Sequence, residues 1–172
     1  MRSTLKTGLI TGLVSSIFLF GFFSLMVWLN TKFGLGMQAS SIRGLGGLIS
    51  VLIQAIGIYM AMQNAKKLAG VLSYGQAVKT GVLVAITIAI IVAIFSALYC
   101  QFINTGFREF MIKDAQKTMI ANGESQQQIG QHLVMVSREF STGTQVIMAL
   151  TGQFFTGLII SLIAGIFVKT KK

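Results

Sequence analysis

The chain has 172 residues, of which 53% are hydrophobic and 10% are charged, and it contains no proline. Charged residues make up roughly a quarter of an ordinary soluble domain. This composition therefore excludes an ordinary soluble domain. The net charge of +10 suits contact with anionic lipid headgroups. Because no base-reading motif accompanies this charge, we expect no nucleic-acid partner.

Four stretches contain no Lys, Arg, Asp or Glu, namely residues 8–30, 45–62, 80–102 and 146–168. A helix needs about 20 apolar residues to cross the hydrocarbon core of a membrane. Three stretches reach that length, and the second can gain turns at both ends. We therefore predict a single all-α domain over residues 1–172, with transmembrane helices over about 8–30, 45–65, 76–102 and 146–168.

The first predicted helix follows a basic start, as the apolar core of a secretory signal does. Its apolar run covers roughly residues 9–29, which is longer than the roughly 7–15 residues of a signal core. The best cleavage-like site, Met37-Gln38-Ala39, lies well beyond this run. We expect the segment to remain as a permanent transmembrane helix.

Basic residues are concentrated on one side of this four-helix topology. The two termini and the connection after the second helix hold eight of them and no acidic residue: Arg2, Lys6, Lys66, Lys67, Lys79, Lys169, Lys171 and Lys172. The first loop on the other side has only Lys32 and Arg43. Because Lys and Arg accumulate in cytoplasmic loops, we expect both termini to be cytoplasmic and this face to contact anionic headgroups of the bilayer.

The connection between the second and third predicted helices reads GVLSYGQAVKTG over residues 70–81. Its glycine spacing is that of a phosphate-binding loop, but Gln76 stands where that motif has lysine, and no apolar strand precedes it. Gly70 is suited to end the second helix. Ser73 and Gln76 have the spacing of a capping box that starts the third helix. We interpret the stretch as a turn between membrane helices.

The segment between the third and fourth predicted helices contains all four acidic residues and the single histidine. Residues 106–121 have a helical pattern, Asn122-Gly123 is a turn signal, and Ser125 with Gln128 forms a second capping-box pattern. An apolar stripe at helical spacing follows: Ile129, Leu133, Val136 and Phe140. We predict a helical hairpin outside the membrane over about 106–140, on the periplasmic side in this topology.

Two interpretations of this apolar stripe stay open. Its residues either pack within the hairpin and on the membrane surface, or form a docking face for another membrane or envelope protein.

Small residues recur at every fourth position in three of the predicted helices: Gly8, Gly12 and Ser16; Gly81, Ala85, Ala89, Ala93 and Ala97; Gly157, Ser161 and Gly165. Residues at this spacing share one helix face and allow close backbone approach in lipid. We expect packing within one bundle, with a homo-oligomer as the alternative. For Gln54 and Gln153 we expect polar contacts between helices, with a solute contact as the alternative.

The predicted transmembrane helices hold no acidic or basic residue that would serve proton-coupled transport. Cys100 and His132 are the only residues of their kinds, so we expect no clustered metal site. Ser137, His132 and Glu139 are the residue types of a catalytic triad, but Ser137 does not share the helix face of His132. We therefore expect no catalytic, cofactor-binding or metal site, and hence no enzyme.

Four motifs run in order along nearly the whole chain: LSYGQAVKTG at 72–81, YCQFIN at 99–104, NGES at 122–125 and GLIISLIA at 157–164. In these motifs the sequence resembles an uncharacterised family of bacterial membrane proteins, domain of unknown function 4199. Thr105 departs from the resemblance, because a proline is expected there. The resemblance implies a four-helix protein of the bacterial inner membrane and implies no activity.

Taken together, these features favour a non-catalytic scaffold or accessory subunit of the inner membrane. An oligomeric channel or carrier for a small solute is the alternative.

Overall fold

The computed structural model describes residues 2–170, and within that range it contains helices and turns but no strand. The elements in chain order are α1 (Arg2–Phe33), α2 (Ala39–Ala69), α3 (Tyr74–Leu98), the π-helix η1 (Tyr99–Ile103), α4 (Phe107–Ala121), α5 (Gln126–Glu139) and α6 (Thr142–Val168). The predicted all-α fold is confirmed. The predicted hairpin corresponds to α4 and α5.

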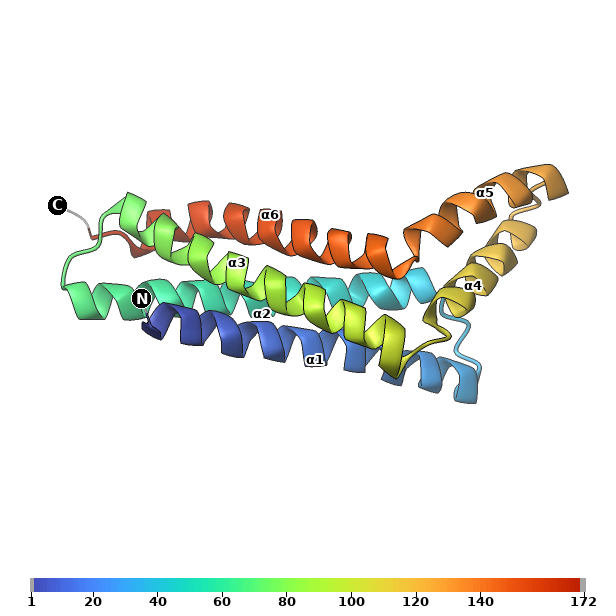
Figure 1. The fold of residues 1–172 in the computed structure, drawn as a ribbon, viewed down its shortest axis with the longest axis horizontal. Coiled ribbons are helices and arrows are strands. Elements are labelled where there is room, and N and C mark those ends of the chain that lie inside the picture. Colours follow the sequence, from blue (N-terminus) through green and yellow to red (C-terminus); the bar gives the residue numbers. More distant parts are fainter. Residues whose placement is uncertain (1, 171–172) are drawn as a thin grey trace.

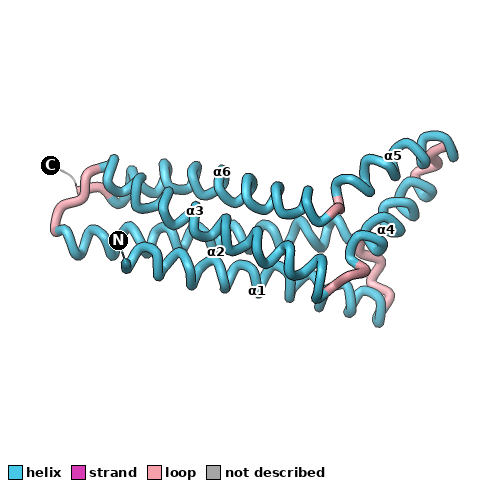
Figure 2. Tube along the Cα trace, in the orientation of Figure 1, coloured by secondary structure: helices cyan, strands magenta, loops and turns pink. Residues whose placement is uncertain are grey.

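Helices α1, α2, α3 and α6 lie along the long axis of the molecule, and the α4–α5 hairpin projects from one end of this bundle (Figure 1). The N-terminus, the connection between α2 and α3, and the C-terminus lie at the other end. We call these the hairpin end and the basic end, the latter because it carries Arg2, Lys6, Lys66, Lys67, Lys79 and Lys169. Figure 2 shows that the loops are short and confined to the two ends.

All four helices of the bundle are long and apolar enough to span a membrane. Each helix extends beyond the uncharged stretch that predicted it. The extension is largest for α2, which begins at Ala39 rather than near residue 45 and ends at Ala69 rather than near residue 62. The chain is thus an integral membrane protein whose helices continue past the hydrocarbon core.

Helix α2 ends and helix α3 begins at the capping residues that the sequence predicted. Gly70 ends α2 with φ +71°, a left-handed conformation that glycine adopts without strain, and its N–H donates to the carbonyl of Lys66. Ser73 accepts from the N–H of Gln76, whose side chain accepts in turn from the N–H of Ser73. This capping box, and the absence of a preceding strand, confirm a turn rather than a phosphate-binding loop.

The small-residue ridges of α3 and α6 pack against each other. A Cβ on Gly157 would lie 3.3 Å from Cα of Ala85 and 2.5 Å from Nε2 of Gln54, so the helices meet where glycine leaves room. One turn away, a Cβ on Gly81 would lie 2.8 Å from Cβ of Ser161. Bundle packing within one chain therefore accounts for these ridges, as lipid-embedded helices require.

The ridge of α1 faces α3 in the same manner. A Cβ on Gly8 would lie 2.8 Å from Cβ of Thr87, and one on Gly12 would lie 2.9 Å from Cδ1 of Ile91. Because α1, α2 and α6 all pack on α3, α3 is the central helix of the bundle. Its buried side chains Val84, Ile88 and Val92 form the middle of the main hydrophobic core.

A matched pair of substitutions in α6 tests this packing. Gly157→Ala adds a methyl group against Ala85 and Gln54, and we expect a loss of stability of about 1–3 kcal/mol from overpacking. Gly152→Ala adds the same group where nothing lies within 4 Å, and we expect equal or higher stability because alanine favours the helix. Thermal unfolding in detergent measures both. Equal unfolding temperatures would mean that the α3–α6 contact is not as close as described.

Candidate functional site

The two glutamines predicted to join helices lie together in the bundle. Nε2 of Gln54 in α2 donates to the backbone carbonyl of Gln153 in α6, at 2.8 Å. Nε2 of Gln153 lies 3.4 Å from the hydroxyl oxygen of Ser50, one turn along α2. Gln54 is fully buried. The pair thus links α2 to α6 near the middle of the membrane-spanning segment, which is the structural contact expected from the sequence.

Three buried oxygens in this region have no hydrogen-bond partner among the described residues: Oγ of Ser15, Oε1 of Gln54 and Oε1 of Gln153. Exchanging the oxygen and nitrogen of the Gln54 amide would not help, because the oxygen would then face the carbonyl to which Nε2 now donates. A buried acceptor without a donor is unfavourable by about 1–3 kcal/mol. In the middle of the bundle, the side-chain nitrogens of Gln54 and Gln153 thus form hydrogen bonds, whereas their side-chain oxygens do not.

Arg43 forms a second polar contact between α2 and α6, closer to the hairpin end. Its Nη2 donates to Oε1 of Gln145 at 2.8 Å, and its guanidinium lies 5.2 Å from the centre of the Phe140 ring. Nε2 of Gln145 donates to the backbone carbonyl of Glu139 at 2.7 Å. Arg43 thus contacts both α6 and the last turn of the hairpin, and its side chain is half-buried.

A chamber of about 280 Å³ lies between these two polar contacts, within the hairpin-end half of the bundle. All four bundle helices contribute to it, and Phe107 of α4 also lines it. Its walls are mainly apolar, including Leu19, Phe20, Phe23, Val92, Met148 and Ala149. Its polar lining is Arg43, Ser96, Tyr99, Cys100, Gln145 and Gln153. The chamber is a mostly apolar space with a single charged side chain.

The apolar stripe of α5 faces inward. Ile129 and Phe140 are buried, with 4% and 8% of their surface exposed, and Leu133 and Val136 are half-buried. Phe140 packs edge-on against Phe107, with ring centres 5.9 Å apart. Of the two interpretations of this stripe, the burial of its residues favours packing inside the hairpin. The physical reason is that α4 covers the stripe when the hairpin closes.

The base of the hairpin is joined to the bundle through an aromatic cluster. Phe107 of α4 lies 5.5 Å from the Phe23 ring of α1 and 5.8 Å from Tyr99 of η1, edge to face in both pairs. The Tyr99 hydroxyl pairs with that of Ser24 at 2.8 Å and accepts from the Asn104 amide at 2.9 Å. The hairpin is therefore part of the same hydrophobic core as the hairpin end of the bundle.

A carboxylate of the hairpin caps a helix of the bundle. Oδ2 of Asp114 in α4 accepts from the N–H of Ala39, the first residue of α2, at 3.0 Å. The residue before it, Gln38, provides no side-chain cap of its own. A negative charge at a helix N-terminus satisfies an unpaired N–H and interacts favourably with the helix dipole. Asp114 therefore stabilises the start of α2 from 75 positions away in the chain.

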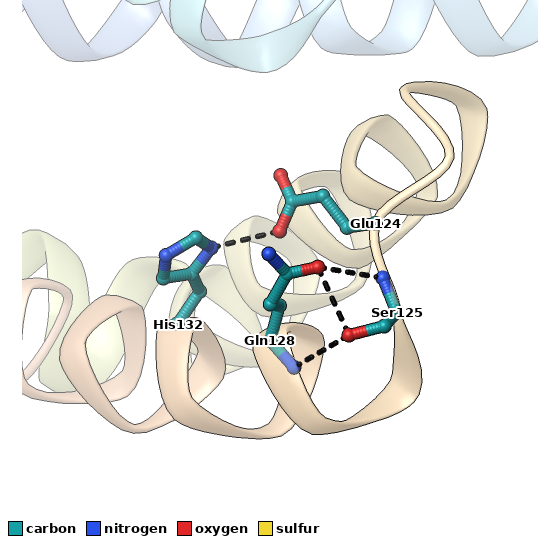
Figure 3. Close-up of polar contacts among 4 residues, drawn as sticks. All are labelled: Glu124, Ser125, Gln128 and His132. Carbon is teal, nitrogen blue, oxygen red and sulfur yellow. Dashed lines mark hydrogen bonds and ion pairs between the residues drawn. The ribbon is translucent and has the colours of Figure 1, made fainter.

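The single histidine of the chain, His132, lies at the tip of the hairpin, but it does not form a catalytic triad with Ser137 and Glu139. Nδ1 of His132 pairs with Oε2 of Glu124 at 2.8 Å, beside the capping box of Ser125 and Gln128 (Figure 3). Ser137 instead accepts from Arg108 through its backbone carbonyl and its hydroxyl oxygen. Within residues 2–170, no three His, Cys, Asp or Glu side chains are placed to hold a metal ion. The tip is thus built from capping and pairing contacts.

Sequence reasoning did not identify Arg43 or Asp114. A signal was available for both. The uncharged stretch at 45–62 is shorter than the roughly 20 residues of a spanning helix, and an extension towards the N-terminus, one of the two directions open to it, would include Arg43. Asp114 falls on the apolar face of α4 between Phe107 and Met119, and a carboxylate on such a face needs a specific partner.

Removal of the Asp114 carboxylate tests the capping contact. We expect Asp114→Ala to destabilise the start of α2 by about 0.5–2 kcal/mol, seen as faster hydrogen exchange over residues 39–42. Asp114→Asn keeps a side-chain oxygen as acceptor and should have the smaller effect. Hydrogen-exchange mass spectrometry in detergent measures both variants. Unchanged exchange in Asp114→Ala would contradict the cap.

Residues 6–170 match a family described as a protein of unknown function, DUF4199. Comparison with curated proteins gives no match, and no solved structure matches. The family match covers the bundle and the hairpin together, which agrees with their shared core. The chain belongs to the DUF4199 family.

Proposed function

We propose that this protein is a non-catalytic scaffold or accessory subunit of the bacterial inner membrane, in which the bundle is the anchor and the hairpin contacts a membrane or envelope protein. The observation that carries the proposal is the rigid attachment of the hairpin. A loop needed only to connect α3 to α6 would take about 2–8 residues. The chain instead forms two capped helices and fixes them to the bundle at several points.

Three sets of contacts support a hairpin of fixed direction. Asp114 holds α4 to the start of α2, and Phe107 anchors the same helix in the aromatic cluster. Arg108 joins α4 to Ser137 of α5. An arm held in this way presents its outer surface in one orientation, and preorganisation of this kind reduces the entropic cost of binding.

The surface available to a partner differs from the stripe that the sequence suggested. On α5, Val134 and Met135 expose 56% and 61% of their surface, and Ile120 at the end of α4 exposes 56%. These three apolar side chains lie outside the closed hairpin, whereas Ile129 is buried. We therefore place the partner contact on the side of α5 that carries Val134 and Met135.

The orientation that we propose puts both termini in the cytoplasm and the hairpin in the periplasm. All positive residues of the basic end lie in short segments without acidic residues, and such segments stay on the cytoplasmic side. Their charge suits the anionic headgroups of that leaflet. At the opposite end, Trp28 is 54% exposed with Lys32 over its ring at 4.7 Å, a pair typical of the membrane boundary.

An oligomeric channel or carrier is the weaker proposal. The polar residues that the sequence suggests for its pathway are Gln54 and Gln153, and these two side chains make contacts between α2 and α6 of one chain. Gln54 has no exposed surface from which it could face a second copy. The contact between these residues favours a structural role.

Photo-crosslinking in native membranes tests the scaffold proposal. With a photoreactive residue at Met135, we expect discrete adducts with a protein, because this side chain is exposed on the hairpin. The same residue at Phe155, which is 59% exposed on α6 within the membrane, should give lipid adducts instead. We also expect Met135→Asp to weaken recovery of the partner, whereas Gln116→Asp on α4 should not. Absence of a protein adduct at Met135 would contradict the proposal.

Reporter fusions test the proposed orientation. A fusion after Lys172 or within residues 66–73 should report a cytoplasmic location, and a fusion at Gly123 in the hairpin tip should report a periplasmic one. Accessibility of a cysteine at Gly123 to a membrane-impermeant maleimide gives a second measurement. The reverse pattern would show that the positive charges do not set the topology.

A further inference from the structure

Within residues 2–170, Arg43 forms no direct ion pair with an acidic side chain. The guanidinium has five N–H donors, and its one hydrogen bond within residues 2–170 is to Gln145. The one ion pair in that range joins His132 to Glu124. Glu139 interacts with Arg43 electrostatically but forms no ion pair or hydrogen bond with it. A half-buried charge without a counter-ion is unfavourable. The side chain is therefore available to bind an anion at the chamber.

Two glycines contribute to the wall of the chamber. Gly47 of α2 and Gly152 of α6 both line it, and a Cβ on either residue would meet nothing within 4 Å. Glycine inside a helix is unfavourable by up to about 1 kcal/mol relative to alanine. At Gly57, Gly81 and Gly157 close packing explains the glycine, but at these two positions it does not. They line the chamber from α2 and α6 without adding a side chain to it.

The chamber has the size and lining of a site for a small ligand. Its volume of about 280 Å³ is roughly twice that of a cavity of about 150 Å³ that binds benzene. Ligand sites are typically apolar spaces with a few polar groups that fix orientation. Here Leu19, Phe20 and Met148 provide apolar wall, and Arg43 provides the charge.

We propose that the chamber binds a single-chain acidic amphiphile, with its carboxylate or phosphate at Arg43 and its apolar part inside the chamber. An arginine fork suits both kinds of anion. An uncharged apolar molecule would leave Arg43 without a counter-ion, and a small anion alone would leave the apolar walls unfilled. This inference does not depend on the proposed contact between the hairpin and a partner.

The position of the chamber in the bundle fits a ligand that comes from the bilayer. Arg43 lies one turn from the start of α2, at the end of the bundle where Trp28 and Lys32 mark the membrane boundary. Gly47 lies one turn further into the membrane, and Gly152, which also lines the chamber, is exposed at the surface of the bundle. A head near the boundary with a tail directed inward is the orientation of an amphiphile in a leaflet.

Native mass spectrometry of the full chain in a non-ionic detergent tests the proposal with three probes. Decanoate has both parts of the ligand, decanol has the chain without the charge, and acetate has the charge without the chain. We expect one decanoate per protein, bound at least about tenfold more tightly than either of the others. If decanol binds equally well, the charge is not recognised, and if acetate does, the chamber is not involved; either result overturns the proposal.

Variants then locate the site. We expect Arg43→Gln to weaken decanoate binding at least about tenfold and to abolish the preference over decanol. Arg138→Gln removes an exposed positive charge near the same end and should leave binding unchanged. Unaltered binding by folded Arg43→Gln overturns the proposal.

A second variant keeps the proposal testable if Arg43→Gln does not fold. Gly152→Leu directs a side chain into the chamber without touching Arg43, and we expect it to remove decanoate binding while the unfolding temperature is maintained. Gly143→Leu is its control on the same helix, because Gly143 also has open space but does not line the chamber. Equal decanoate binding by the two leucine variants overturns the proposal.

Discussion

The close approach of α3 and α6 sets the geometry of the whole bundle. Apolar side chains gain little by leaving lipid for another helix, so the helices are held by packing of small residues and by interhelical hydrogen bonds. Gly157 seats against Ala85, and Gly81 against Ser161. These contacts fix α6 against α3, and α1 also packs on α3. The fourth helix, α2, is joined to α6 by the hydrogen bond from the Gln54 amide to the carbonyl of Gln153.

The same constraint explains where the bundle is open. Close contacts of glycine lie in the half of α6 near the basic end, and α3 and α6 diverge towards the hairpin end (Figure 1). There, Gly152 meets no neighbour, and the chamber occupies the space. The contact of Arg43 with Gln145 restores a link between α2 and α6 beyond it. The position of small residues along α3 and α6 thus explains why the bundle is closely packed towards the basic end and more open towards the hairpin end.

The hairpin and the chamber share structural elements. Phe107 anchors α4 in the aromatic cluster and also lines the chamber. Phe140 ends α5, packs on Phe107 and lies against the guanidinium of Arg43. Two phenylalanines therefore connect the hairpin, which carries the proposed partner contact, to the proposed ligand site in the bundle.

Hydropathy, helix periodicity and capping-box spacing were sufficient to predict the four spanning helices, the hairpin and both capping boxes, because each depends on local patterns. The scarcity of polar groups in the membrane segments indicated Gln54 and Gln153 as candidates for contacts between helices, but not that they would contact each other. The inward direction of the Ile129 stripe, the cap of Asp114 on Ala39 and the link of Arg43 to Gln145 depended on the tertiary structure. The latter two pairs are 75 and 102 positions apart. A helical pattern shows that a face is apolar, but only the crossing and closure of helices decides what covers that face and which distant groups meet.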